Sequence, residues 1–184
     1  MKKNSVKRFL QNILLAVELT IYIAYLHFDK VLFIGIIALD QYTKFLVTSS
    51  MKIGDTIPII QNIFHITYVA NPGAAFGILP YQQAFFIGTG TVMLAVAIFC
   101  YVKFGKNISN VTKYGGIIAA AGAMANMLDR ITGGYVTDLF DVRILNFPVF
   151  NVADIAIVIG MFVMMYVVMF PLERITAVKE VRQP

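Results

Sequence analysis

Three long runs of residues without a formal charge constrain this chain more than any other feature, and they lie at residues 84–102, 114–128 and 155–172. A helix that crosses a membrane needs about 20 mostly apolar residues, so each run predicts one crossing. Apolar residues make up 59% of the chain and charged residues 14%, which leaves too few polar side chains to cover a water-soluble core. The sequence therefore predicts a single-domain, all-α polytopic membrane protein.

A fourth run, at residues 31–48, is apolar for nine residues and then carries Asp40 and Lys44. Because these two residues are four positions apart, they share one face of a helix. This run predicts a crossing with one polar face. The four predicted transmembrane helices are residues 31–48, 84–103, 114–130 and 152–171, and they form a membrane domain over residues 31–172.

Basic residues flank the apolar runs and indicate how the chain is oriented. They gather before residue 9, from residue 103 to residue 113, and after residue 173, and such clusters mark cytoplasmic segments. Both termini are therefore expected in the cytoplasm, which requires an even number of crossings. Residues 1–30 are interpreted as a cytoplasmic extension with an N-terminal interfacial helix, a fifth span being the alternative. A cleaved signal peptide is disfavoured because no small-residue cleavage site follows, and residues 173–184 form a cytoplasmic tail.

Charge and cysteine usage narrow the possible partners. The net charge of +5 is spread over short flanks and not along one stripe, so no nucleic-acid partner is expected. The single cysteine, Cys100, excludes an internal disulfide and is expected to be a small buried apolar residue. Seven small residues between positions 115 and 123 predict one helix that packs closely against its neighbours.

Two segments face the outside in this topology, residues 49–83 and about 131–150. The first alternates β-forming residues with Gly and Pro, which predicts short strands and a turn at Asn71–Gly73, lying on the membrane surface. In the second, Gly133 and Gly134 precede an extended stretch that carries Asp138. A small β-rich extracytoplasmic loop region is therefore expected.

Carboxylates near the spans are the first functional candidates, because charge is costly in hydrocarbon. Asn151 is a good N-cap for the last helix and would place Asp154 in its first turn, at the same outer boundary as Asp138. Two carboxylates in one poorly hydrated site cannot both ionise cheaply, so they share a proton. Such a pair can hydrolyse a peptide bond, one Asp taking a proton from water and the other donating one. Helix capping is the alternative role for both, and Asp129 is equally explained by an ion pair.

Motifs of other hydrolases and of nucleotide-binding proteins are absent from the sequence. It contains no HExxH, GxSxG, Walker A or GxGxxG pattern, and His27 and His65 lack metal-ligand spacing. Neither a metal nor another cofactor is expected.

Five short motifs, in order along residues 31–170, resemble those of the bacterial lipoprotein signal peptidases, also called type II signal peptidases. They are DQYTK at 40–44, NPGAAF at 71–76, GAMANMLDR at 122–130, VTD at 136–138 and FNVAD at 150–154. Three positions, Ala70, Ala125 and Thr137, depart from the family pattern, which has an arginine, a glycine and an aliphatic residue there.

The resemblance implies an intramembrane aspartyl endopeptidase that cuts diacylglyceryl-modified prolipoproteins before the lipidated cysteine. It implies a protein of the bacterial cytoplasmic membrane, in contact with membrane lipids, whose active site lies near the extracytoplasmic face; a monomer is expected. The implied catalytic pair is Asp138 and Asp154. The implied substrate-binding residues are Asn71, Gly122, Asn126, Arg130 and Asn151, and the implied supporting residues are Asp40, Lys44 and Asp129.

Two other classes of function remain open on the residues alone. A proton- or ion-coupled carrier also holds carboxylates inside a helix bundle, although it should place them near the middle of the membrane and show repeated halves. A non-catalytic membrane scaffold would need no pair of aspartates at helix ends.

Overall fold

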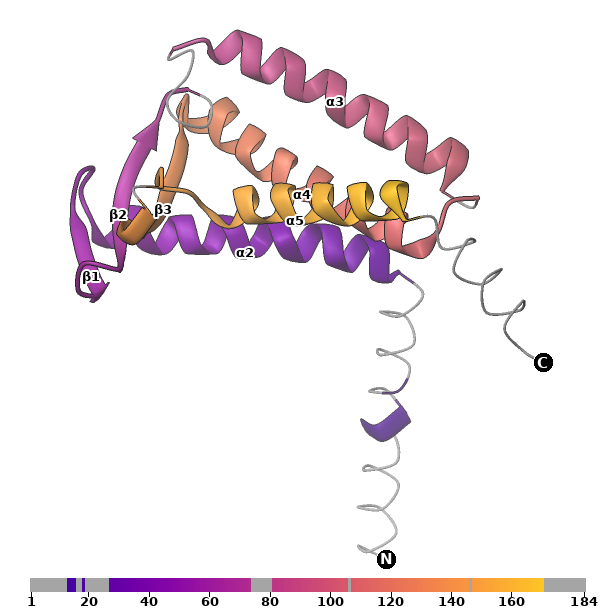
Figure 1. Cartoon of the computed structure of the whole chain (residues 1–184), viewed down its shortest axis with the longest axis horizontal. Coiled ribbons are helices and arrows are strands. Elements are labelled where there is room, and N and C mark those ends of the chain that lie inside the picture. Colours follow the sequence, from indigo (N-terminus) through magenta and orange to yellow (C-terminus); the bar gives the residue numbers. More distant parts are fainter. Residues whose placement is uncertain are drawn as a thin grey trace, which may run out of the picture.

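The computed structural model describes residues 13–15, 18, 27–73, 81–105, 107–145 and 147–170. Within these residues the chain forms long helices and one three-stranded sheet. In chain order the elements are α2 (Phe28–Ser50), β1 (Thr56–Ile60), β2 (Phe64–Asn71), α3 (Gln83–Phe104), α4 (Asn110–Gly133), β3 (Val136–Val142), the short 3-10 helix η2 (Arg143–Leu145) and α5 (Val152–Met169). Figure 1 shows the helices grouped into a bundle, with the sheet across the end at which α2 stops.

Three helices among the described residues, α2, α3 and α5, are long and apolar enough to cross a membrane. Helix α4 is 24 residues long but does not belong to this group. Its composition is the reason, because nine of its 24 residues are Gly or Ala and it also carries Asn126, Asp129 and Arg130. The crossing predicted for residues 114–128 therefore stays a prediction. Most of the predicted extension at residues 1–30, and the whole of the predicted tail at residues 173–184, fall outside the described residues.

Helices α4 and α5 approach each other until their backbones touch. A Cβ atom added to Gly160 of α5 would lie 2.5 Å from the carbonyl oxygen of Gly115 and 2.6 Å from the amide nitrogen of Ala119, both on α4. One added to Gly122 would meet the carbonyl oxygen of Ala153. The predicted close packing of the small-residue helix is therefore confirmed, and small residues set the distance between these helices.

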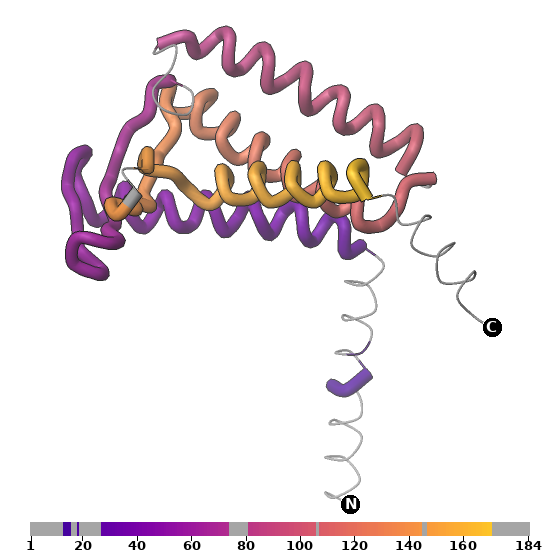
Figure 2. Tube along the Cα trace, in the orientation of Figure 1, coloured from indigo at the N-terminus to yellow at the C-terminus, as the bar shows by residue number. Residues whose placement is uncertain are grey.

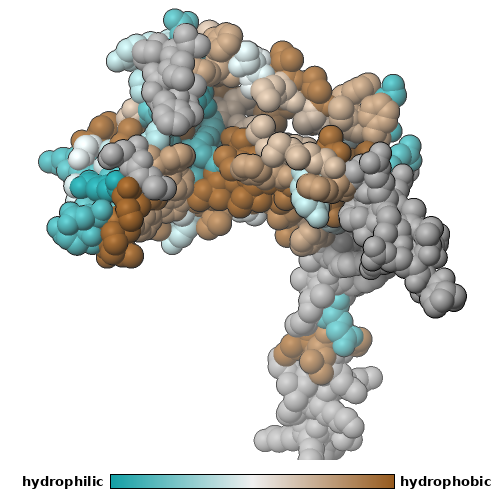
Figure 3. All heavy atoms as spheres, in the orientation of Figure 1, coloured by the Kyte–Doolittle hydropathy of each residue, from teal (hydrophilic) through white to brown (hydrophobic). Residues whose placement is uncertain are grey.

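Helix α3 packs against α4 at the outside of the bundle, where Figure 2 shows it, and Leu94 is its one buried residue. The prediction of a buried Cys100 is wrong, because this residue is exposed on α3. The physical reason is that α3 is long and apolar enough to cross a membrane, and an apolar side chain that faces hydrocarbon needs no protein neighbour. Figure 3 shows hydrophobic atoms over much of the bundle.

A polar cluster fastens α3 at the end of the bundle away from the sheet. Asp29 at the start of α2 accepts a hydrogen bond from the hydroxyl of Tyr101 on α3. The ammonium of Lys113 on α4 lies 3.5 Å from Asp29 and 5.4 Å from the centre of the Tyr101 ring. Three helices are therefore joined at this end.

The sheet has the order β1–β2–β3 and is antiparallel throughout. Its inner face packs on the end of α2, where Val47 meets Tyr68 and Leu139. Helix α4 ends at Gly133, and Gly134, with φ of +75°, adopts the left-handed conformation that glycine tolerates. This turn sends the chain directly into β3, and the predicted short strands are therefore confirmed.

Adding a methyl group between α4 and α5 is expected to destabilise the fold. Gly160→Ala should lower the free energy of unfolding by about 1–3 kcal/mol, because the new Cβ overlaps backbone atoms of α4. Gly35→Ala on α2 is the control, since nothing lies within 4 Å of its Cβ position, and it should raise stability by about 0.5–1 kcal/mol. Unfolding in detergent, followed by loss of helicity, measures both; equal stability of the two variants would contradict the close approach.

Candidate active site

Two aspartates reach the sheet end of the bundle from different elements. Asp138 lies on β3, opposite Val69 of β2, and is 3% exposed. Asp154 lies in the first turn of α5. Asn151 caps that helix: its Oδ1 accepts the Asp154 amide N–H at 2.9 Å, while Asp154 Oδ2 accepts the Asn151 amide N–H at 3.0 Å. The N-cap predicted at Asn151 is therefore confirmed, and the cap fixes the direction of the Asp154 side chain.

Two asparagine amides connect the aspartates. Asn151 Nδ2 donates to Asp138 Oδ1 at 2.7 Å, and Asn126 Nδ2 of α4 donates to Asp154 Oδ1 at 2.8 Å. Asn151 Nδ2 also donates to Asn126 Oδ1 at 3.1 Å. Asn71, the last residue of β2, donates from Nδ2 to Asp138 Oδ2 at 3.0 Å. Both aspartates therefore belong to one continuous hydrogen-bonded network that spans four elements.

The ammonium group of Lys44 contacts this network at Asn126. Lys44 Nζ is 2.7 Å from Asp40 Oδ2, 2.8 Å from Asp129 Oδ2 and 3.0 Å from Asn126 Oδ1, so its three N–H groups each have an acceptor. Asp40 Oδ1 accepts the Ala153 amide N–H of α5 at 2.8 Å. Lys44 thus joins α2 to α4 and, through Asp40, to the turn that carries Asp154.

Asp129 contacts both the Lys44 ammonium and the sheet. Its Oδ2 accepts the Thr137 amide N–H at 3.2 Å, and its Oδ1 accepts Gln41 Nε2 at 2.7 Å. Gln41 is not among the predicted site residues. The sequence signal that could have identified it is its position directly after Asp40 in the DQYTK motif. Asp129 therefore holds β3 at the residue before Asp138.

Burial changes the acidity of Asp138. Loss of hydration raises the pKa of Asp138 to about 7, and the nearby charge of Asp154 acts in the same direction. The hydrogen bonds from Asn71 and Asn151 and the charge of Lys44 oppose this rise. Asp138 therefore keeps its proton in mildly acidic conditions and loses it as the pH rises through about 7, as expected for one of two acids in a poorly hydrated site.

Arg130 holds the turn that follows β2. It donates from NH2 to the Gly73 carbonyl oxygen at 3.0 Å and from NH1 to the Asn126 carbonyl oxygen at 3.2 Å, and its guanidinium lies 5.1 Å from the centre of the Phe86 ring on α3. The Gly73 amide N–H donates to Asn71 Oδ1 at 3.0 Å, which is the predicted turn. Gln83 at the start of α3, a residue that the sequence analysis did not select, donates from Nε2 to the Pro72 carbonyl oxygen at 3.0 Å.

The structure brings four of the five predicted binding residues to this network, namely Asn71, Asn126, Arg130 and Asn151. Gly122 lies one turn before Asn126, against the Ala153 carbonyl oxygen and Ile157 of α5. It therefore contacts the backbone of α5 and acts on the aspartates through the position of that helix.

The edge of β3 beside Asp138 is occupied by the protein itself. The Thr137 N–H donates to Asp129, and the Thr137 carbonyl oxygen accepts Asn151 Nδ2 at 3.3 Å. The amide N–H groups of Leu139 and Phe140 both donate to the Phe150 carbonyl oxygen, at 3.0 and 2.8 Å. A peptide cannot add to this edge as a further strand without displacing these contacts.

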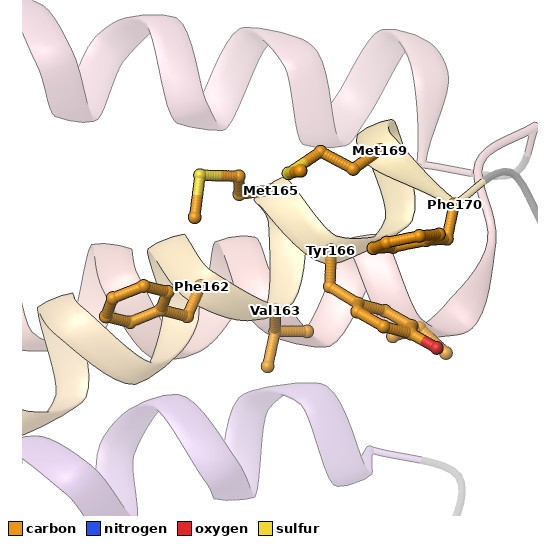
Figure 4. A pocket seen from close by; sticks show the side chains of 7 residues that line it. Phe162, Val163, Met165, Tyr166, Met169 and Phe170 are labelled. Carbon is orange, nitrogen blue, oxygen red and sulfur yellow. The ribbon is translucent and has the colours of Figure 1, made fainter.

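A separate apolar depression lies at the other end of α5. Figure 4 shows side chains of its last turns, including Phe162, Met165 and Met169, on the wall of this depression. It is about 20 Å along the helix from Asp154 and contains no polar side chain except Tyr166. Among the described residues, no group of three or more His, Cys, Asp or Glu side chains is placed to hold a metal ion.

Comparisons with known proteins agree on one family. Residues 32–170 match the family described as signal peptidase (SPase) II. The lipoprotein signal peptidase of Halothermothrix orenii is 46% identical over 125 residues, which cover 68% of this chain and 83% of that protein. The lipoprotein signal peptidase of Clostridioides difficile is 40% identical over 136 residues, which cover 73% and 90%. A solved structure described as a bacterial membrane enzyme, determined by the in meso method at 2.3 Å resolution, is similar with a TM-score of 0.72 and 30% identity, over 77% of this chain and 87% of that one.

Removing the buried ammonium is expected to destabilise the protein strongly. Lys44→Met should lower the free energy of unfolding by about 3–5 kcal/mol, because Asp40 and Asp129 would remain buried without their cation. Lys52→Met is the matched control on an exposed residue and should change stability by less than about 0.5 kcal/mol. Thermal unfolding in the same detergent compares the two; a Lys44 variant as stable as the control would show that the ion pairs do not hold the bundle.

Proposed function

This chain belongs to the signal peptidase II family, and on that basis we propose that it is a membrane aspartyl endopeptidase that removes the signal peptide from diacylglyceryl-modified prolipoproteins, cutting before the lipidated cysteine. The observation that carries the catalytic assignment is the connection of Asp138 to Asp154 through Asn151. Its amide nitrogen atoms, one in the side chain and one in the backbone, contact one carboxylate each.

The proposed reaction assigns one role to each aspartate. Asp154 acts as the carboxylate that takes a proton from the attacking water. The water oxygen then bonds to the scissile carbonyl carbon, while Asp138 gives its proton to the carbonyl oxygen. When this tetrahedral intermediate breaks down, the C–N bond breaks and Asp154 gives the proton that it took from water to the leaving amine. Asp138 takes back a proton from a hydroxyl of the intermediate as the C=O bond of the new carboxyl group forms, which restores both aspartates. The raised pKa of Asp138 supports its role as the acid.

The remaining polar residues are proposed to position the pair and the substrate. Asn71 donates to Asp138, and Arg130 contacts the same turn through the Gly73 carbonyl oxygen. We therefore place the substrate backbone near this turn, with Asn71 and Arg130 as its first polar contacts. Three further residues hold the network in place through the ion pairs of the buried ammonium, namely Asp40, Lys44 and Asp129.

The proposed topology has four crossings, made by α2, α3, α4 and α5. Helix α4 packs against α5 and holds Lys113 at one end and Asp129 at the other, next to elements that α2 and α5 also contact. The sheet and the aspartates then lie at the extracytoplasmic face of the bacterial cytoplasmic membrane, and both termini lie in the cytoplasm. Within the described residues, Asp138 and Asp154 lie at an end of the bundle and not at its middle, which disfavours the carrier alternative.

Replacing either proposed catalytic aspartate should abolish cleavage. Asp138→Asn and Asp154→Asn are each expected to lower kcat by at least about 10²–10⁴-fold, because one lacks the proton donor and the other the base. The assay uses purified protein in detergent with a diacylglyceryl-modified prolipoprotein, and with its unmodified form as the substrate control. Asp55→Asn, on an exposed loop, is the matched control and should retain full activity.

Circular dichroism should find both variants folded, and EDTA should leave the wild-type rate unchanged because no metal takes part. Cleavage by a folded Asp138 or Asp154 variant contradicts the assignment of the pair. Failure of the folded wild-type protein on both substrates contradicts the proposed function itself.

The rate is expected to fall at alkaline pH. Asp138 has its pKa raised to about 7, so its catalytic proton is present below that pH and lost above it. The value of kcat/KM should therefore decrease about tenfold per pH unit above about pH 7, with apparent pKa values that belong to the pair. Activity should return when protein incubated at pH 9 is assayed again at pH 6. A rate that stays constant up to pH 9 is incompatible with Asp138 as the acid.

A further inference from the structure

Among the described residues, three buried side-chain atoms that can form hydrogen bonds have no partner, namely His65 Nε2, Gln83 Oε1 and Arg130 Nε. A buried polar atom without a partner costs free energy, and native structures leave few of them. Two of the three atoms belong to Gln83 and Arg130, the residues that hold the turn after β2. These two atoms therefore indicate that a polar ligand binds beside this turn.

The turn fixes the carboxamide of Gln83 in one orientation. Its Nε2 donates to the Pro72 carbonyl oxygen at 3.0 Å. A carbonyl oxygen can only accept, so the nitrogen of the carboxamide lies toward Pro72 and the oxygen points elsewhere. The Pro72 carbonyl oxygen also accepts the Tyr81 amide N–H at 3.2 Å. Turning the carboxamide over would therefore break an existing hydrogen bond, and Oε1 stays an acceptor in need of a donor.

Gln83 and Arg130 approach the turn from two different helices. Gln83 binds the carbonyl oxygen of Pro72, and Arg130 binds that of the next residue, Gly73. Phe86 lies three residues after Gln83, on the same face of α3, and its ring centre is 5.1 Å from the Arg130 guanidinium. An unpaired acceptor and an unpaired donor therefore meet where α3, α4 and the turn come together.

The same turn leads to the proposed catalytic pair. Asn71, where the turn begins, donates to Asp138 Oδ2 at 3.0 Å. The charges of Asp154 and Asp138 also act on the guanidinium of Arg130. One residue of extended chain spans about 3.3 Å, so a peptide bond held at Asp138 has its neighbouring peptide units within reach of this turn. We therefore expect the substrate chain on one side of the scissile bond to lie beside Gln83.

The chemistry of the two unpaired atoms selects the peptide part of the substrate. Gln83 Oε1 needs a donor and Arg130 Nε needs an acceptor. Every peptide unit except one before proline supplies both, as an N–H and a C=O group. A diacylglyceryl group has ester carbonyl oxygens but neither an N–H nor an O–H group, so it cannot donate to Gln83. The ligand of Gln83 is therefore a backbone N–H and not the lipid.

We propose that Gln83 is a substrate-binding residue whose Oε1 accepts a backbone N–H of the prolipoprotein next to the scissile bond. This inference rests on the proposed function, and none of the five motifs contains Gln83. Because Oε1 is covered in the free protein, the first turn of α3 shifts when the substrate binds. Leu94 is the one buried residue of α3, so the helix is held loosely enough for a small shift. The new hydrogen bond pairs an unpaired acceptor and so favours the bound state.

Two substitutions at position 83 separate the acceptor of the carboxamide from its donor. Gln83→Met removes both and should raise KM for a diacylglyceryl-modified prolipoprotein about three- to tenfold, with kcat within about twofold. Gln83→Glu keeps an acceptor oxygen and should hold KM within about twofold of the wild-type value. Gln82→Met is the matched control, because Gln82 is the neighbouring exposed glutamine and its side chain makes no cap hydrogen bond; it should change neither constant.

The outcomes that overturn the proposal differ from the one that overturns the proposed function. An equal rise of KM in both position-83 variants would assign the effect to the lost Pro72 contact and not to the acceptor. A wild-type KM in Gln83→Met would show that water pairs Oε1 and that the substrate does not. Failure of the folded wild-type protein to cleave the prolipoprotein would contradict the proposed function itself.

A scan of the substrate identifies the N–H group. Lipidated peptides are made in which one backbone amide near the scissile bond is an ester, while the scissile amide is kept. At one position the wild-type KM should rise about three- to tenfold and Gln83→Met should show no further rise, because both changes remove one hydrogen bond. Equal further losses in both proteins at every position would overturn the contact. Measured as Kd in the Asp154→Asn background, the comparison needs no cleavage, so it separates a failed contact from a failed proposed function.

Discussion

The structure depends first on one buried cation, the ammonium of Lys44. It is bound by Asp40 on its own helix and by Asp129 and Asn126 on α4. Asp40 also holds the first turn of α5, and Asp129 also holds β3. Buried ion pairs add little net stability, since desolvation offsets the attraction, but breaking one is expensive. The consequence is specificity: only one arrangement of α2, α4, α5 and β3 leaves none of these charges unpaired.

Two asparagines connect the two aspartates of the candidate site. A carboxylate can only accept hydrogen bonds, so two carboxylates brought together need donors between them or a shared proton. Asn126 and Asn151 supply those donors, because each amide both donates and accepts. Asp138 and Asp154 can therefore lie in one network although one belongs to a strand and the other to a helix. Burial then raises the pKa of Asp138 and so favours its neutral form.

The apolar side chains have the complementary arrangement. Many of the large apolar residues of α2, α3 and α5 point outward, while the interior between α4 and α5 is formed by glycine and alanine in backbone contact. In a lipid environment no hydrophobic force drives helices together, so close backbone contact and buried polar groups must determine which surfaces meet. The same reasoning explains the exposed Cys100 on α3.

The sequence by itself determined the local structure. Apolar runs located the helices, alternating β-forming residues located the strands, and Asn151 indicated the cap that places Asp154, because each of these patterns involves residues close along the chain. Only the tertiary structure decided that Lys44 binds Asp129, that Gln41 joins this ion pair, and that Gly122 contacts the backbone of α5. It also decided that Asp138 is buried deeply enough to raise its pKa. These properties depend on distances between elements far apart in sequence and on the water removed by packing, which no local pattern encodes.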